Sequence, residues 1–230
     1  MAILASYPSA VGTTGSERRD RLARARLYLC LEARPHGRDP EPLLAAALRG
    51  GVDVVQLRDK DAGNAEILAA AEVFRRLCDE HHALFVLNDR PDLALRCGAD
   101  GVHVGQEDLP VAAARAITGP ELVIGLSTHA PAELDAAEGA DYVAVGPVWA
   151  TPTKEGRPAA GLDYVRYAAA HAREPWFAIG GIDLERGPAV VAAGATRLCI
   201  LRAIRDAGDP EAVARALRAL LPRLASWTPI

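Results

Sequence analysis

The stretch Val52-Asp53-Val54-Val55-Gln56-Leu57-Arg58-Asp59-Lys60 joins a short apolar run to a compact polar cluster. The segment NAEILAAAEVFRRLCDEHH follows from Asn64, and apolar residues recur along one helical stripe of it, at Ile67, Leu68, Ala71, Phe74 and Cys78. A short, nearly continuous apolar run is typical of a strand that is covered on both faces in a parallel sheet. Together the two segments predict one strand–helix unit, with polar side chains where the strand ends.

The same unit recurs along the chain. Candidate strands begin at Arg26, Val52, Ala83, Gly101, Leu122, Asp141, Trp176 and Arg197, and helical patterns begin at Glu41, Asn64, Val111, Pro131, Leu162, Leu184 and Asp209. Eight units of about 25 residues match the period of a (β/α)8 TIM barrel. We predict an α/β fold with one (β/α)8 barrel domain over residues 26–230, after an N-terminal extension over residues 1–25 that is loose or a short helix. A doubly wound open sheet is the alternative topology.

The composition limits the classes of function. Half of the 230 residues are apolar, and the net charge of −4 argues against nucleic acid or an anionic membrane as the main partner. No charge-free apolar run approaches the roughly 18 residues that a membrane span needs, and the opening residues lack the pattern of a secretory signal. The four cysteines show no metal-ligand spacing, so we expect buried, reduced thiols in a cytoplasmic protein. Small molecules are the expected partners, and assembly into a homo-oligomer is allowed.

Polar residues gather where the predicted strands end, which is the face of a barrel that holds the active site. They are Gln56, Arg58, Asp59 and Lys60; Asn88, Asp89 and Arg90; Gln106 and Asp108; Ser127, Thr128 and His129; Thr151, Thr153 and Lys154; Gly180 and Gly181; and Arg202. The 26 basic residues include only two lysines, Lys60 and Lys154, and both lie at these strand ends. Such clustering of a rare residue type indicates a functional site.

Three of these side chains suit an anionic substrate. Lys60 and Lys154 are mobile point charges and Arg58 is a planar fork, a combination that fits a polyphosphate, although a lone exposed cation is most often a solvated charge. The pair Gly180-Gly181 allows backbone N–H groups to approach a second anion closely. Barrels often bind phosphate with the loops after strands seven and eight, and an ordinary tight turn is the alternative for this pair.

Asp89 and Asp108 follow neighbouring predicted strands. Two carboxylates, together with phosphate oxygens and water, are ligands that Mg²⁺ commonly takes. An acid/base pair and helix N-capping are the alternatives for these two residues. His103 is expected to point into the barrel as a hydrogen-bonded core residue. No Ser-His-Asp arrangement accompanies His129, so neither histidine is assigned the role of a base.

With these residues assembled, the chain resembles the thiamine-phosphate synthase family from about Leu27 to the last predicted helix. The motifs that support the resemblance are QLRDK over residues 56–60, Asn88-Asp89, GVHVGQEDLP through Asp108, GLSTH around Ser127, GPVWATPTK through Lys154, and AIGGI through Gly181. No single motif is decisive, but six of them in order at strand ends are a specific signal.

The resemblance implies a TIM-barrel transferase of thiamine biosynthesis that joins a pyrimidine diphosphate to a thiazole phosphate and releases pyrophosphate. Family positions imply that Gln56, Leu57, Arg58, Asp59, Lys60, Asn88, Ser127 and Lys154 hold the pyrimidine diphosphate, with Arg58, Lys60, Ser127 and Lys154 as the catalytic candidates. They imply that Asp89 and Asp108 bind Mg²⁺. They also imply that Thr151, Pro152, Thr153, Gly181, Leu201 and Arg202 hold the thiazole phosphate.

Two positions depart from the family pattern. Arg202 stands where a small residue is frequent, and Arg197 stands where glycine is frequent, so the contacts to the thiazole phosphate are the least defined part of the expectation. The alternative function within the same superfamily is a thiazole tautomerase, which has no diphosphate to hold. A non-catalytic sensor of phosphorylated ligands on a barrel is the alternative from a different class.

Overall fold

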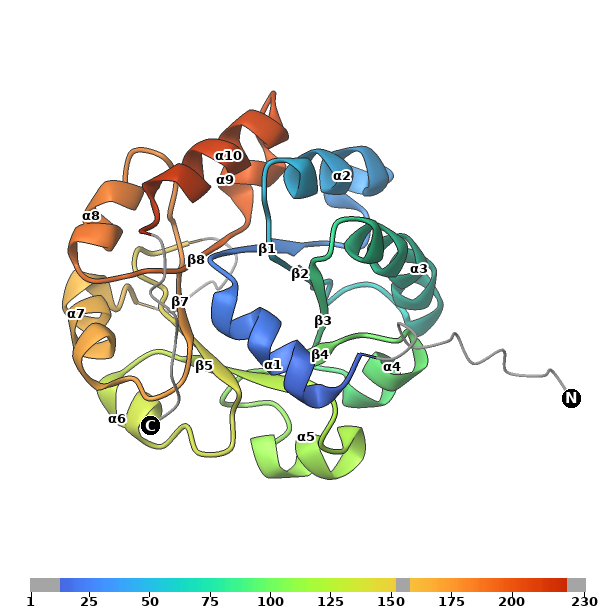
Figure 1. Cartoon of the computed structure of the whole chain (residues 1–230), viewed down its shortest axis with the longest axis horizontal. Coiled ribbons are helices and arrows are strands. Elements are labelled where there is room, and N and C mark those ends of the chain that lie inside the picture. Colours follow the sequence, from blue (N-terminus) through green and yellow to red (C-terminus); the bar gives the residue numbers. More distant parts are fainter. Residues whose placement is uncertain (1–12, 152–157, 223–230) are drawn as a thin grey trace, which may run out of the picture.

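The computed structural model describes residues 13–151 and 158–222. Eight parallel strands close into a barrel in chain order, because β8 pairs with β1 (Figure 1). The strands are β1 Leu27–Leu31, β2 Val54–Leu57, β3 Leu84–Asn88, β4 Gly101–Val104, β5 Val123–Thr128, β6 Tyr142–Val145, β7 Trp176–Ile179 and β8 Leu198–Ile200. This closure confirms the predicted (β/α)8 barrel and excludes the open doubly wound sheet.

Helices form an outer ring around the strands (Figure 1). Those that follow the successive strands are α2 Glu41–Arg49, α3 Asn64–Glu80, α4 Pro91–Arg96, α5 Val111–Thr118, α6 Pro131–Asp135, α7 Gly161–His171, α8 Gly187–Ala192 and α10 Pro210–Leu220. Two shorter elements, the 3-10 turn η1 Pro35–Gly37 and helix α9 Arg202–Arg205, follow β1 and β8. In the described part of the chain, no helix is both long and apolar enough to cross a bilayer.

Each strand divides its side chains between two apolar clusters, because successive side chains point to opposite faces of a sheet. On β2, Val54 packs inside the barrel, whereas Val55 and Leu57 pack outward against the helices. All four cysteines are buried, as predicted, with Cys30 and Cys199 inside the barrel. Along β2, a side chain therefore points into the barrel when it lies an even number of residues from Val54.

Helix α1 Gly15–Arg24 lies across the end of the barrel where the strands begin (Figure 1). Thr14 and Glu17 form a reciprocal capping box at its first turn, which satisfies N–H groups that a helix start leaves open. Leu22 packs into the interior cluster of the barrel. At the end of the helix, the buried Arg197 donates to the carbonyls of Ala23 (2.9 Å) and Ala25 (3.1 Å). Arg197 thus lies at the strand-start end, and it does not reach the ends of the strands.

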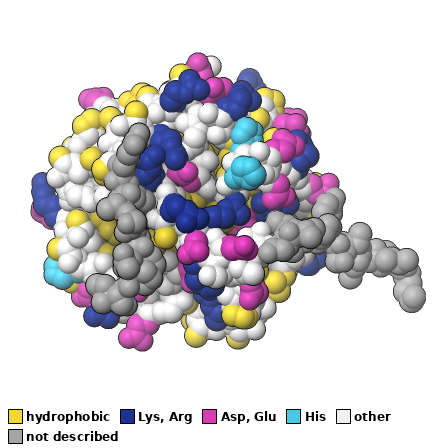
Figure 2. All heavy atoms as spheres, viewed as in Figure 1, with side chains coloured by type: hydrophobic (Ala, Val, Ile, Leu, Met, Phe, Trp, Pro, Cys, Tyr) yellow, Lys and Arg dark blue, Asp and Glu magenta, His cyan; other side chains and the backbone are white. Residues whose placement is uncertain are grey.

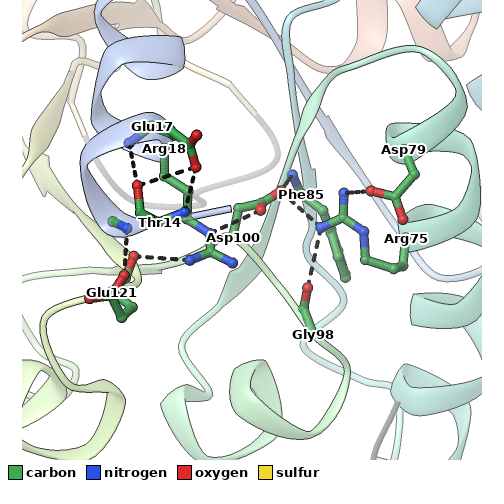
Figure 3. Close-up of polar contacts among 10 residues, drawn as sticks. Thr14, Glu17, Arg18, Arg75, Asp79, Phe85, Gly98, Asp100 and Glu121 are labelled. Carbon is green, nitrogen blue, oxygen red and sulfur yellow. Dashed lines mark hydrogen bonds and ion pairs between the residues drawn. The ribbon is translucent and has the colours of Figure 1, made fainter. Parts of the chain in front are cut away.

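A buried charge network ties α1 to the barrel (Figure 3). Asp100, which has no exposed surface, accepts from Arg18 Nε at 3.1 Å, from Arg75 Nη1 at 2.8 Å and from the backbone N–H of Phe85 at 2.9 Å. Basic and acidic side chains also lie side by side at the surface of this face (Figure 2). The strand-start end of a TIM barrel serves stability, whereas the active site lies at the end where the strands finish.

Candidate active site

A cavity of about 350 Å³ opens at the ends of the strands. The predicted site residues that line it are Gln56, Arg58, Lys60, Asn88, Asp89, Asp108, Ser127, Thr151, Gly181, Leu201 and Arg202. They come from loops and strands spread over nearly the whole chain, and closure of the barrel brings them around one space. The lining also includes His129, which has no role assigned from the sequence, and side chains that the sequence did not point to, among them Tyr28 and Arg186.

Two predicted residues are placed outside the cavity lining. The Leu57 side chain is fully buried in the outer core, because it alternates with Gln56 along β2. Asp59 accepts from the backbone N–H groups of Ala33 (3.2 Å) and Ala62 (3.2 Å), so its carboxylate shapes the loop after β2. The predicted residues Pro152, Thr153 and Lys154 lie outside the described residues.

The two carboxylates predicted to bind a metal line the cavity together. Asp89 adopts a left-handed backbone conformation (φ 59°), which is uncommon for a residue with a side chain and is concentrated at functional sites. Burial, followed by a hydrogen bond and like-charge repulsion from Asp108, raises the pKa of Asp89, and Lys60 partly offsets this effect. Lys60 Nζ lies 3.4 Å from Asp89 Oδ2. A divalent cation between the carboxylates would relieve their repulsion.

Two arginines of the cavity differ from the structural arginines of the chain. No carboxylate partner for Arg58 or Arg202 is found in residues 13–151 and 158–222, whereas Arg18 and Arg75 are paired with Asp100. Both side chains line the cavity, one after β2 and the other after β8. An unpaired guanidinium at a cavity wall is available for a phosphate oxygen.

The glycine pair after β7 brings two loops into contact. A side chain at Gly180 would lie 2.5 Å from Pro147, and a side chain at Gly181 would lie 2.9 Å from the Cβ atom of Trp149. The Arg186 guanidinium stacks over the Trp149 ring at 5.3 Å and donates to the Gly181 carbonyl at 3.0 Å. The pair therefore allows close approach of the loop after β6, and the sequence contained no motif that singled out Arg186.

The loops after β7 and β8 have the backbone features of a phosphate site, as the sequence led us to expect. Gly181 lies on one side of the cavity, and the short helix α9 begins directly after Leu201, at Arg202. A glycine-containing loop after the seventh strand and a short extra helix after the eighth are the usual phosphate-binding elements of TIM barrels. This part of the cavity can accommodate a phosphate beside Arg202.

The floor of the cavity is a chain of polar side chains inside the barrel. His103 contacts Ser127 Oγ through Nε2 (2.9 Å) and the Tyr142 hydroxyl through Nδ1 (3.1 Å). The Tyr142 hydroxyl lies 2.9 Å from that of Tyr28, which in turn accepts from Gln56 Nε2 at 2.9 Å. His103 is buried and hydrogen-bonded, as the sequence predicted for it.

A closed eight-stranded barrel whose strand-end cavity is lined by cations and carboxylates defines a class, the TIM-barrel enzymes, in which this face carries the active site and often a phosphate site. Comparison with known proteins narrows the class. The family model of thiamine monophosphate synthase matches residues 27–204. The chain belongs to this family of enzymes of thiamine biosynthesis.

Individual relatives agree with the family match. A thiamine-phosphate synthase of Thermobifida fusca is 56% identical over 205 residues, which cover 87% of this chain and 94% of the relative. One of Saccharopolyspora erythraea is 50% identical over 220 residues, with 91% and 99% covered. The solved structure of a thiamine phosphate pyrophosphorylase from Pyrococcus furiosus superposes with a TM-score of 0.78 at 32% identity and covers 88% of this chain and 96% of its own.

Proposed function

We propose that this protein couples 4-amino-2-methyl-5-hydroxymethylpyrimidine diphosphate to 4-methyl-5-(2-hydroxyethyl)thiazole phosphate, or to its carboxylated form, and releases thiamine phosphate and pyrophosphate. The observation that supports this function most directly is the cavity wall where Arg58 and Lys60 stand beside two adjacent carboxylates, Asp89 and Asp108. Cations next to a pair of hard oxygen ligands suit a diphosphate and its divalent cation. Both substrates are small molecules, and we place the reaction in the cytoplasm.

The cations of the cavity stabilise the departing group. The amino group and ring nitrogens of the pyrimidine stabilise positive charge at the exocyclic methylene, so the C–O bond to diphosphate breaks before the thiazole nitrogen attacks that carbon. Arg58 and Lys60 are positioned to stabilise the negative charge that develops on the diphosphate, which is electrostatic catalysis. Lys154, which lies outside the described residues, is assigned as a third cation from the sequence alone. Because the attacking nitrogen carries no proton, the reaction needs no general base.

The residues present fit a magnesium ion. Asp89 and Asp108 line the same cavity and provide hard oxygen ligands. Within the described ranges, no cluster of three or more His, Cys, Asp or Glu residues is suited to a metal, so diphosphate oxygens and water would complete the coordination. Bound there, Mg²⁺ would neutralise charge on the diphosphate.

The remaining predicted contacts divide between the two substrates. Gln56, Asn88 and Ser127 line the cavity near the carboxylates and are assigned to the pyrimidine diphosphate. For the thiazole phosphate we assign the wall formed by Thr151, Gly181, Leu201 and Arg202. Pro152 and Thr153, which lie outside the described residues, are assigned to the same substrate from the sequence. Holding the thiazole nitrogen in line with the methylene carbon provides the proximity that the second step requires.

The experiment that tests the function supplies purified protein with both substrates and Mg²⁺ and measures thiamine phosphate and pyrophosphate together. Equal amounts of the two products are expected. The Arg58→Ala variant should lose most of this activity, while Arg166→Ala, which removes an exposed arginine of α7, should retain it. Isomerisation of the thiazole phosphate without pyrophosphate release would overturn the proposal in favour of a thiazole tautomerase, and ligand binding without either reaction would favour a sensor.

A further inference from the structure

The polar chain on the cavity floor crosses most of the barrel interior. It joins Gln56 on β2, Tyr28 on β1, Tyr142 on β6, His103 on β4 and Ser127 on β5 by four hydrogen bonds of 2.9–3.1 Å. None of the five residues is more than 8% exposed. Hydrogen bonds in such a setting are stronger than in water, and an unmatched donor there is costly. The direction in which each proton points is therefore constrained along the whole chain.

The direction in which protons are donated along the chain is set by Gln56, which lies at one end of it. Gln56 Oε1 accepts from the Cys30 thiol at 3.3 Å, and its Nε2 donates to the Tyr28 hydroxyl. Tyr28 then has one proton and, within the described residues, one hydrogen-bond acceptor for it, the Tyr142 oxygen at 2.9 Å. Burial raises the pKa of both tyrosines well above its ordinary value, so each keeps its proton to donate.

The remaining protons are placed by the same reasoning. Since Tyr142 accepts from Tyr28, its own proton goes to Nδ1 of His103 at 3.1 Å. Because Nδ1 accepts this proton, the His103 ring carries its own proton on Nε2 and donates it to Ser127 Oγ at 2.9 Å. The Ser127 hydroxyl proton is then directed to the cavity that this side chain lines. The reverse direction would leave the Tyr28 proton facing the Gln56 N–H group.

The backbone makes room for this arrangement at one position. A side chain on Gly125, in the middle of β5, would lie 2.1 Å from the Tyr142 ring and 2.5 Å from His103 Nδ1. Glycine in a strand interior marks such close approach. Phe177 packs edge-on against both tyrosine rings, with centroids at 5.2 Å from Tyr28 and 5.9 Å from Tyr142. The tyrosines are thus held in place by packing as well as by hydrogen bonds.

We propose that Tyr142, oriented by Tyr28 and acting through His103, is a positioning residue that makes the Ser127 hydroxyl a hydrogen-bond donor to the pyrimidine diphosphate. The inference rests on the proposed function, because it takes this substrate as the ligand of Ser127. Ring nitrogens and diphosphate oxygens of this substrate are acceptors, so a donor at Ser127 matches them. A serine without the chain would rotate freely between donor and acceptor.

The test compares Tyr142→Phe with Tyr164→Phe in steady-state kinetics with each substrate varied. Both substitutions remove one buried hydroxyl, but Tyr164 donates to Thr128 Oγ1 (2.7 Å) in the outer core. Tyr142→Phe should lower kcat/KM for the pyrimidine diphosphate by about three- to tenfold, the worth of one hydrogen bond, and leave KM for the thiazole phosphate within about twofold. Tyr164→Phe should leave both within about twofold, and Tyr28→Phe should repeat the Tyr142→Phe pattern more weakly.

A double-mutant cycle separates positioning from packing. In a Ser127→Ala background, Tyr142→Phe should change kcat/KM by less than about twofold, because the hydroxyl through which it acts is absent. An unchanged loss in that background, or an equal loss for both substrates, would overturn the proposal.

Nitrogen-15 NMR of the labelled histidines tests the direction of the hydrogen bonds without any turnover. His103, assigned among the six histidines by a His103→Asn variant, should carry its proton on Nε2 in the wild type and lose this preference in Tyr142→Phe. A proton on Nδ1 in the wild type would refute the direction of the chain. If the wild type formed no thiamine phosphate, the proposed function would fail, but the tautomer of His103 would still show the direction of the hydrogen bonds.

Discussion

Replacing Asp100 by asparagine should destabilise the barrel strongly without changing its chemistry. Asp100 is fully buried and accepts from two arginines and one backbone N–H group (Figure 3). The asparagine has the same shape, but it carries no charge and offers an N–H₂ group where donors already converge. Arg18 and Arg75, which are 3% and 6% exposed, then lose the charge that compensates their burial.

The magnitude follows from these contacts. Burial alone lowers the pKa of Arg75, yet the charge and the hydrogen bond of Asp100 outweigh burial and leave it raised. Removing one partner of a buried, hydrogen-bonded ion pair typically costs about 3–5 kcal/mol. Two charge-assisted hydrogen bonds of about 1.5–3 kcal/mol each lead to the same range. Because a domain is stable by only about 5–15 kcal/mol, the variant should lose roughly a fifth or more of its free energy of unfolding.

Urea denaturation at 25 °C, followed by circular dichroism, measures this loss. With a slope of about 2–3 kcal/mol per molar urea, the midpoint should fall by roughly 1–2 M. The control is Arg166→Ala, whose exposed pair with Asp163 is worth at most about 1 kcal/mol. At 10 °C the folded Asp100→Asn variant should keep kcat within about twofold, since Asp100 lies before β4 and the cavity lies at the strand ends. A stability loss no larger than that of the control would refute the reasoning on the buried pair, and a large loss of kcat would refute the separation of the two barrel ends.

Four further predictions concern the cavity and the buried thiols. Arg58→Ala should lower kcat/KM for the pyrimidine diphosphate by about 10- to 100-fold through loss of charge-assisted contacts, with an unchanged urea midpoint as the sign that the fold is intact. Arg202→Ala should raise KM for the thiazole phosphate about tenfold, and an equal rise for the pyrimidine diphosphate would contradict the assignment of the two walls. Chelation of divalent cations by EDTA should abolish turnover and added Mg²⁺ should restore it, whereas full activity in EDTA would argue against a metal at Asp89. Burial raises the pKa of Cys78 to about 12 and that of Cys97 to about 11, so between pH 9 and 11 the unfolded chain loses thiol protons that the folded chain keeps. The free energy of unfolding should therefore fall by about 1 kcal/mol per pH unit for each thiol, and urea midpoints that stay constant over this range would contradict it.

Local patterns in the sequence were enough to predict the architecture and most of the cavity wall. Eight apolar runs alternate with helical stripes, and this alternation is a property of neighbouring residues that needs no knowledge of distant contacts. The polar residues that end the strands, such as Arg58 and Asp108, are in the predicted place because all strands of a parallel barrel end at one face.

The direction in which an individual side chain points depended on its place in the alternation along the strand and on closure of the barrel. Leu57 and Asp59 belong to the same motif as Gln56, but strand pleating and loop hydrogen bonds turn them away from the cavity. Arg197 departs from the family pattern, but it lies away from the phosphate site. Its side chain donates to carbonyls at the C-terminus of helix α1, at the opposite end of the barrel.

Contacts across the barrel interior could not be predicted from the sequence. Tyr28 and Tyr142 are 114 residues apart, and their hydroxyls meet only because β1 and β6 face each other inside a closed sheet. Each tyrosine by itself has the pattern of a packing residue in an apolar strand. The sequence therefore determined the barrel and the face on which it works, whereas three-dimensional closure determined which buried groups share hydrogen bonds, because those depend on distances across the barrel that no local pattern encodes.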